Sequence, residues 1–126
     1  MASKIYKIIF LLLIVFYQTA SFSKSFEANH VYNYFSALIA LDKNKNFESL
    51  SYFNSSKKLK ESHPSYIKKY VFSLILSGKV AKGISEIKLT KNKKFVDFFE
   101  GHLLLVIDSL KKGDYKKSLY YLRSLK

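Results

Sequence analysis

The chain has 126 residues, enough for one domain, and 48% of them are hydrophobic, so it can bury a core. It has no cysteine, which excludes disulfides, thiolate catalysis, cysteine-based zinc sites and a lipid-modified cysteine anchor. The formal net charge is +13. A charge of this sign raises the possibility of a nucleic-acid or anionic-membrane ligand.

The distribution of the positive charge along the chain indicates a solvated surface more than a nucleic-acid or membrane site. Lysines occur in every segment, whereas Arg123 is the only arginine. Arginine is the residue preferred for direct recognition of bases and phosphates. Abundant Lys, Asn, Ile, Phe and Tyr are typical of an AT-rich coding bias, so we interpret most lysines as a solvated surface. We expect no specific nucleic-acid partner.

Residues 1–25 have the pattern of a targeting segment. Lys4 and Lys7 precede a continuous apolar run from Ile8 to Tyr17, and small residues follow it. The run is short for a membrane-spanning helix, which favours a cleaved signal peptide over an uncleaved anchor formed by residues 5–22 in an inner membrane. A buried N-terminal helix is the third alternative. The first two predict an exported, periplasmic or membrane-anchored protein.

Beyond this segment, apolar residues recur at helical spacing and β-type alternation is absent, so we expect an all-α fold. The expected helices span residues 26–41, 47–61, 64–76, 80–89, 95–111 and 115 to the end. The inward-facing residues expected on the first five helices are, in chain order, Val31, Tyr34, Leu38 and Leu41; Leu50, Phe53 and Leu59; Ile67, Tyr70, Val71 and Leu74; Ile84 and Ile87; and Phe98, His102, Leu105 and Val106. On the last helix, Tyr115, Leu119, Leu122 and Leu125 mark one apolar face.

The six expected helices form three pairs, and one turn separates the two helices of each pair. Gly113 and Gly78 suit the left-handed backbone that closes a helix, and Asn44 tolerates it. Asp114 can cap the next helix. Gly83 is expected where paired helices approach closely. Aligning Phe47, Val80 and Tyr115 gives intervals of 33 and 35 residues.

A helix–turn–helix unit repeating near 34 residues resembles the tetratricopeptide repeat (TPR) family. The most specific match is Gly113-Asp114-Tyr115 followed by the small residue Ser118. The chain departs from the family pattern at Leu50, where a small residue is usual, and Pro64 comes slightly late. The resemblance implies a right-handed superhelical stack of about three hairpins, with repeats at 26–62, 63–92 and 93–126. The chain as a whole is similar to the N-terminal part of longer exported bacterial TPR proteins.

The resemblance also implies a concave face that binds a protein or peptide partner. The residues expected on it are Tyr32, Phe35, Ser36 and Ile39 from the first unit; Lys68, Lys69, Phe72, Ile75 and Leu76 from the second; and Glu100, Leu103, Leu104, Ile107 and Lys111 from the third. Phe35 and Ile39 stand where carboxylate-clamping members carry polar residues, so the expected ligand is apolar or amphipathic. The alternative is that this strip packs against another part of the protein or another copy.

The last helix presents leucines to an uncovered edge, which predicts self-association or a longer repeat array. Catalysis has little support: His30, His63 and His102 are dispersed, and the Glu27/His30 pair is ordinary surface chemistry. We therefore expect no enzyme, metal or cofactor, and an exported interaction scaffold. The alternative is a basic helical protein that binds phospholipid or nucleic acid.

Overall fold

A computed structural model describes residues 28–125, and this part of the chain is all-helical, without a strand. The all-α prediction is confirmed. The α-helices are α2 (Ala28–Asp42), α3 (Asn46–Ser55), α4 (Tyr66–Leu76), α5 (Val80–Leu89), α6 (Phe99–Lys111) and α7 (Tyr115–Arg123), with 3-10 helices η1 (Lys57–Glu61) and η2 (Lys93–Val96) between them. The predicted signal or anchor at residues 1–25 lies outside the described residues.

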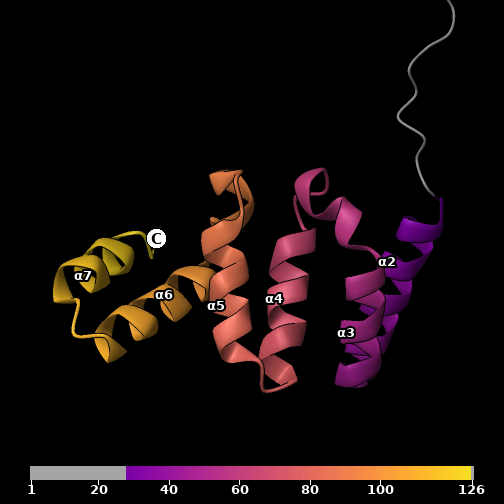
Figure 1. The fold of residues 1–126 in the computed structure, drawn as a ribbon, viewed down its shortest axis with the longest axis horizontal. Helices are drawn as coiled ribbons and strands as arrows, with labels where there is room; N and C mark the ends of the chain where they lie inside the picture. The colour runs from indigo at the N-terminus through magenta and orange to yellow at the C-terminus, as the bar shows by residue number, and fades with distance from the viewer. Residues whose placement is uncertain (1–27, 126) are drawn as a thin grey trace, which may run out of the picture.

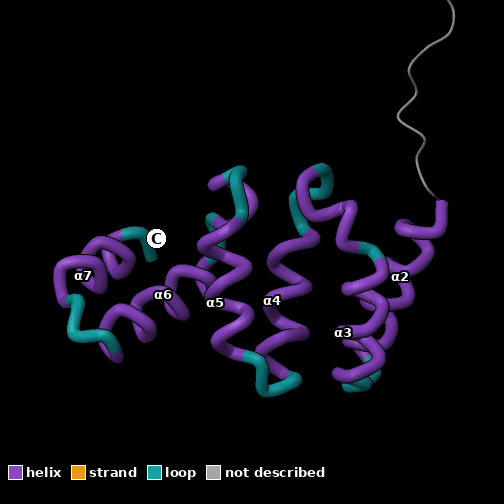
Figure 2. Tube along the Cα trace, viewed as in Figure 1, coloured by secondary structure: helices purple, strands orange, loops and turns teal. Residues whose placement is uncertain are grey.

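The six α-helices form three consecutive hairpins, α2–α3, α4–α5 and α6–α7, because each helix packs most extensively against its partner in the pair. Between hairpins, α3 packs on α4 and α5 packs on α6. Figure 1 shows the helices following one another across the molecule, with α2 to α5 side by side and the α6–α7 hairpin inclined to them. The loops fall at the ends of the helices (Figure 2).

The three hairpin turns have the same geometry. Asn44, Gly78 and Gly113 have φ values of 55, 74 and 72°. In each turn the amide after this residue bonds a carbonyl in the last turn of the first helix: Lys45 to Ala40 at 2.8 Å, Lys79 to Leu74 at 2.8 Å and Asp114 to Ser109 at 2.9 Å. This is the pattern that closes a helix through a left-handed residue. The predicted turns are confirmed, as is the Asp114 cap, whose side chain accepts from the Lys117 amide.

The shared turn corrects the repeat alignment by one residue. Counting from Asn44, Gly78 and Gly113, the second helices begin at Asn46, Val80 and Tyr115, not at Phe47, Val80 and Tyr115. The intervals become 34 and 35 residues. The small residue then falls on Ser49, Gly83 and Ser118, all buried. The apparent departure at Leu50 was therefore a misalignment.

These small residues let the two helices of a hairpin approach. The Ser49 hydroxyl donates to the Ala37 carbonyl at 3.0 Å, and a Cβ built on Gly83 would lie 3.6 Å from Val71 Cγ1. Gly83 therefore faces α4, as expected, but the room beside it would also accept an alanine.

The core is centred on four aromatic rings from the first two hairpins. Phe53 lies 6.0 Å from Tyr34, 5.6 Å from Tyr66 and 6.0 Å from Tyr70, measured between ring centroids. The predicted inward-facing residues that are buried are Tyr34, Leu50, Phe53, Ile67, Tyr70, Val71, Leu74, Ile87, Leu105 and Val106. Those that are partly buried are Val31, Leu38, Leu41, Leu59, Ile84, Phe98 and His102. On the apolar face expected for the last helix, Leu125 is partly buried, whereas Tyr115, Leu119 and Leu122 are exposed.

Several expected helices are shorter than predicted. The helix expected over 47–61 ends at Ser55 and continues only as η1, because the Ser56 hydroxyl bonds the carbonyls of Tyr52 and Phe53 in the last turn. The helix expected over 95–111 begins at Phe99. Phe98 is extended (φ −141°, ψ 146°), and its ring lies 2.9 Å from where a Cβ on Gly101 would be. Similarly, α4 begins two residues after Pro64.

Serine hydroxyl groups join the first hairpin to the second. The Ser73 hydroxyl on α4 donates to that of Ser49 on α3 at 3.3 Å, and Ser77 donates to the Asn46 carbonyl at 3.3 Å. Ser49 and Ser73 are fully buried. Short uncharged side chains therefore close the end of this junction that lies nearest the turns.

Gly83→Ala should stabilise the fold by up to about 1 kcal/mol, because alanine has the higher helix propensity and the nearest atoms leave ordinary van der Waals room. Urea unfolding followed by circular dichroism would measure it. Gly78→Ala is the matched control and should instead cost about 1 kcal/mol, because φ is +74° there. A loss of stability in both variants would contradict the described spacing of α4 and α5.

Candidate partner-binding surfaces

Most of the residues expected on the concave face are exposed. The exposed fractions are 66% for Tyr32, 57% for Phe35, 57% for Ile39, 46% for Phe72, 40% for Leu103 and 53% for Ile107. Lys68 and Lys69 are also exposed, whereas Ile75 and Leu104 are partly buried against the core. The first helix of every hairpin therefore keeps apolar side chains in contact with solvent.

A charged contact brings the α4 and α6 parts of this set together. The Lys68 ammonium lies 3.1 Å from a Glu100 carboxylate oxygen and 5.7 Å from the centroid of the Phe98 ring. A hydrogen bond from its own backbone amide, and then one from Lys68, holds the pKa of Glu100 below its usual value. The α2 residues Tyr32, Phe35 and Ile39 form a separate stripe along their own helix.

An open groove of about 970 Å³ lies between α5 and α6. Its apolar lining comes mainly from Val80, Ala81, Ile84 and Leu89 on α5, faced by Ile107 on α6. Ile107 and Lys111 are the only residues of the predicted concave set that line it. Sequence reasoning missed the α5 wall because Ile84 was assigned to the interior. Val80 and Ile84 are four residues apart and so lie on one face of α5, and this spacing could have indicated the wall.

Lysine side chains surround this groove and one carboxylate partly neutralises them. Asp108 Oδ2 lies 2.5 Å from Lys88 Nζ and 2.9 Å from Lys112 Nζ. These hydrogen bonds, first that from Lys88 and then that from Lys112, lower the pKa of Asp108. Lys111 adds a further positive charge to the lining. The groove is therefore apolar within and positive at its margin, and the Lys88–Asp108 pair also ties α5 to α6.

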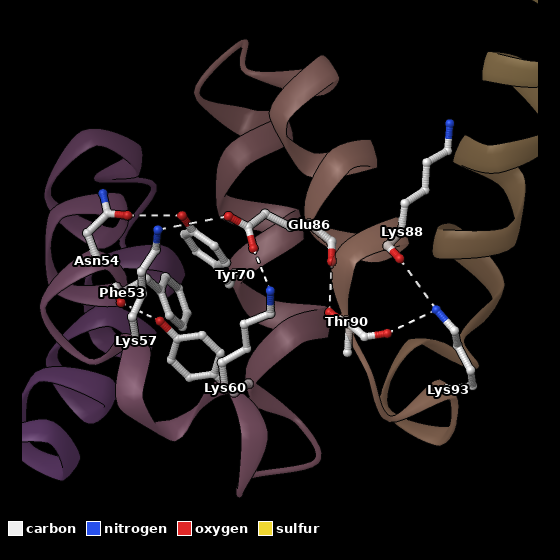
Figure 3. Close-up of polar contacts among 10 residues, drawn as sticks. Phe53, Asn54, Lys57, Lys60, Tyr70, Glu86, Lys88, Thr90 and Lys93 are labelled. Atoms are coloured by element: carbon white, nitrogen blue, oxygen red, sulfur yellow. Dashed lines mark hydrogen bonds and ion pairs between the residues drawn. The ribbon is translucent and has the colours of Figure 1, made fainter.

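A second charged cluster is engaged within the fold. In Figure 3, Glu86 on α5 points toward Lys57 and Lys60, and Tyr70 toward Asn54. Glu86 lies 2.7 Å from Lys60 and 3.9 Å from Lys57, and the Tyr70 hydroxyl donates to Asn54 at 2.9 Å. These contacts join η1 and α3 to the second hairpin, so the cluster serves cohesion.

The same figure shows how the end of α5 is held (Figure 3). The buried Thr90 hydroxyl donates to the Glu86 carbonyl at 2.8 Å, and Lys93 donates to the Thr90 carbonyl at 3.0 Å. Both bonds satisfy carbonyls near the C-terminus of the helix. This polar network therefore caps the C-terminal end of α5, and its hydroxyl and ammonium groups are used within the fold.

The three histidines have different partners. His30 Nδ1 donates to the Ser55 carbonyl at 2.8 Å, His63 lies 4.7 Å from the Tyr34 ring between centroids, and His102 Nε2 is 2.9 Å from Asp97. His102 is partly buried, and its partner Asp97 is on the preceding loop. Within residues 28–125, no three acidic or histidine side chains are grouped to hold a metal ion. Glu27 lies outside the described residues, and the absence of enzymatic function stays a prediction.

None of the helices described between residues 28 and 125 combines the length and the apolar character needed to span a membrane. Comparisons of the chain with protein-family models, with curated proteins and with solved structures find no match.

Proposed function

We propose that the chain is an exported scaffold of three TPR-like repeats, stacked in a right-handed superhelix, that binds another protein. The repeat part of the proposal is supported by the common turn at Asn44, Gly78 and Gly113 and by intervals of 34 and 35 residues. The buried small residue that follows each turn adds further support. Export rests on the sequence pattern of residues 1–25.

The observation that carries the binding proposal is the apolar surface left on the first helices. Phe72, Leu103 and Ile107 on α4 and α6 are 40–53% exposed, and none of them is needed to complete the core. Apolar groups clustered on a surface mark interaction sites when they are contiguous. Ile107 connects this strip to the groove between α5 and α6.

The surroundings of this surface define the partner's chemistry. Lys68 and Lys69 flank Phe72 on α4, and Lys88, Lys111 and Lys112 border the groove. A partner segment with apolar anchors and flanking Asp or Glu would bury the former and pair the latter. An amphipathic helix with an acidic margin has this composition. Burying each large apolar anchor contributes about 1.5–3 kcal/mol.

Phe72→Glu should abolish capture of the partner while leaving the helix content unchanged, because a carboxylate in the strip would lose its solvation on binding. The measurement is a pull-down with the purified chain as bait, with bound proteins identified by mass spectrometry. The matched control is Phe47→Glu, which places the same charge at a 76% exposed position on α3. Capture that is equal for wild type and Phe72→Glu would contradict the assigned strip.

The same experiment at low and high salt separates the scaffold from the alternative, an anionic-surface binder. Binding to phosphate groups weakens steeply with salt because counterions are released. Apolar anchors are not screened by salt, so binding to the scaffold should lose only the small share that its exposed ion pairs contribute. A partner that is a phospholipid or nucleic acid, and that is lost at high salt from wild type and both variants alike, would reject the scaffold.

A further inference from the structure

The repeat register shows which positions join one hairpin to the next. Six residues after each turn stand Leu50, Ile84 and Leu119, and nine residues after it stand Phe53, Ile87 and Leu122. Phe53 is 0% and Ile87 2% exposed. Phe53 packs on the α4 rings, and Ile87 shares the core with Val96 and Leu105. On α7, the equivalent Leu119 and Leu122 are 54% and 50% exposed.

The opposite side of that contact can be identified in the same way. On α4, the Tyr66 hydroxyl donates to the Phe53 carbonyl and Ser73 donates to Ser49, so both residues face the preceding hairpin. Their equivalents on α2, counted back from the turn, are Tyr32 and Ile39. These two residues are exposed, although Tyr66 and Ser73 are fully buried. We therefore assign Tyr32 and Ile39 to the leading edge of the stack.

We infer that two copies of this chain associate head to tail, with Leu119 and Leu122 of one copy packing against Tyr32 and Ile39 of the next. The contact would repeat the one that α3 makes with α4 inside the molecule. It is thus a continuation of the α3–α4 interface, which the fold already contains. Neither edge is self-complementary in this register, so the association is heterologous and can add further copies.

The charges on the two edges are compatible with this contact. α7 carries Lys116, Lys117 and Arg123, whereas α2 has no lysine or arginine between Ala28 and Asp42. Cationic side chains at the margin of α7 would therefore meet no like charge on α2. Burying half-exposed leucine, isoleucine and tyrosine side chains supplies the driving force. Tyr32 and Ile39 belong to the concave set expected from the sequence but not to the strip formed by Phe72, Leu103 and Ile107, so this inference does not depend on the proposed partner-binding strip.

The test uses two variants of the full chain, each blocking one edge. Leu122→Glu removes the α7 edge and Ile39→Glu removes the α2 edge, and both sites are half exposed, so folding is retained and checked by circular dichroism. Sedimentation velocity over a range of concentrations should show wild-type oligomers that grow with concentration. Each variant alone should be monomeric, with its dissociation constant raised by at least about tenfold.

Mixing the two variants is the decisive step. The Leu122→Glu chain keeps its α2 edge and the Ile39→Glu chain keeps its α7 edge, so the mixture should form a one-to-one dimer and nothing larger. Phe47→Glu, outside both edges, should associate like wild type.

Each alternative occupant gives a result that overturns the inference. Pairing of α7 with α7 would make Leu122→Glu monomeric and leave Ile39→Glu unaffected, and mixing would not restore the dimer. Association through residues 1–27 would persist in both variants. A wild-type chain that stays monomeric at all concentrations would show that the α2 edge is covered within the molecule or that neither edge binds.

Discussion

Replacing Phe53 with alanine should lower the free energy of unfolding by about 3–5 kcal/mol. The ring is 0% exposed and lies at the centre of the aromatic cluster, in contact with Tyr34 on α2 and with Tyr66 and Tyr70 on α4. Its removal leaves a cavity that three large rings cannot fill without leaving their positions. Because a small domain is stable by only about 5–15 kcal/mol, the variant should unfold far below the wild-type temperature.

Thermal and urea unfolding monitored by circular dichroism would measure the effect. Phe47→Ala is a close control, since it makes the same substitution on the same helix at a 76% exposed position, and it should change stability by less than about 0.5 kcal/mol. Comparable losses in the two variants would mean that Phe53 does not hold α3 to α4. A large loss confined to Phe53 would support the junction that the structure describes.

Raising the pH from about 10 to about 12 should unfold the protein cooperatively. Burial raises the pKa of Tyr66 above that of an ordinary tyrosine, raises the pKa of Tyr70 to about 12 and raises the pKa of Tyr34. A phenol whose pKa is higher in the folded state binds its proton more tightly there. Its contribution to stability is complete below pH 10 and is lost as the pH rises toward the folded-state pKa.

The phenolate absorbance and the helical circular dichroism should therefore change together in this range for the buried tyrosines. Tyr70→Phe removes one of the linked protons, at the expense of a bond to Asn54, which is itself exposed. Its alkaline midpoint should move to higher pH. Helicity that persists unchanged to pH 12 in the wild type, or a midpoint unaltered in Tyr70→Phe, would contradict the burial of these hydroxyl groups.

The sequence was most informative where structure is decided locally. Gly78, Gly113 and Asn44 predicted their turns because a positive φ is favoured by few residue types. The inward face of α4 was also predictable, because helices pack on both sides of it and Ile67, Tyr70, Val71 and Leu74 are all required by the core. The misalignment at Leu50 arose from matching aromatic Phe47 to Tyr115 instead of matching the turns.

What could not be predicted depends on the placement of whole hairpins. The break between η2 and α6 was missed for a different reason, since the contact that accompanies it is local: the Phe98 ring lies over Gly101, three residues later. The groove between α5 and α6 depends on the inclination of the third hairpin, which is set by long-range packing. Of the candidate site, the sequence predicted the exposed apolar residues on α4 and α6, but not the α5 wall that faces Ile107.

The two junctions between hairpins hold their charged contacts in different surroundings. At the first junction the Lys60 and Glu86 side chains are both mostly buried, whereas at the second Lys88 is exposed at the margin of an open groove, where it pairs with Asp108. Salt screens exposed charges more strongly than buried ones. The angle between the second and third hairpins should accordingly respond to ionic strength more than the angle between the first and the second.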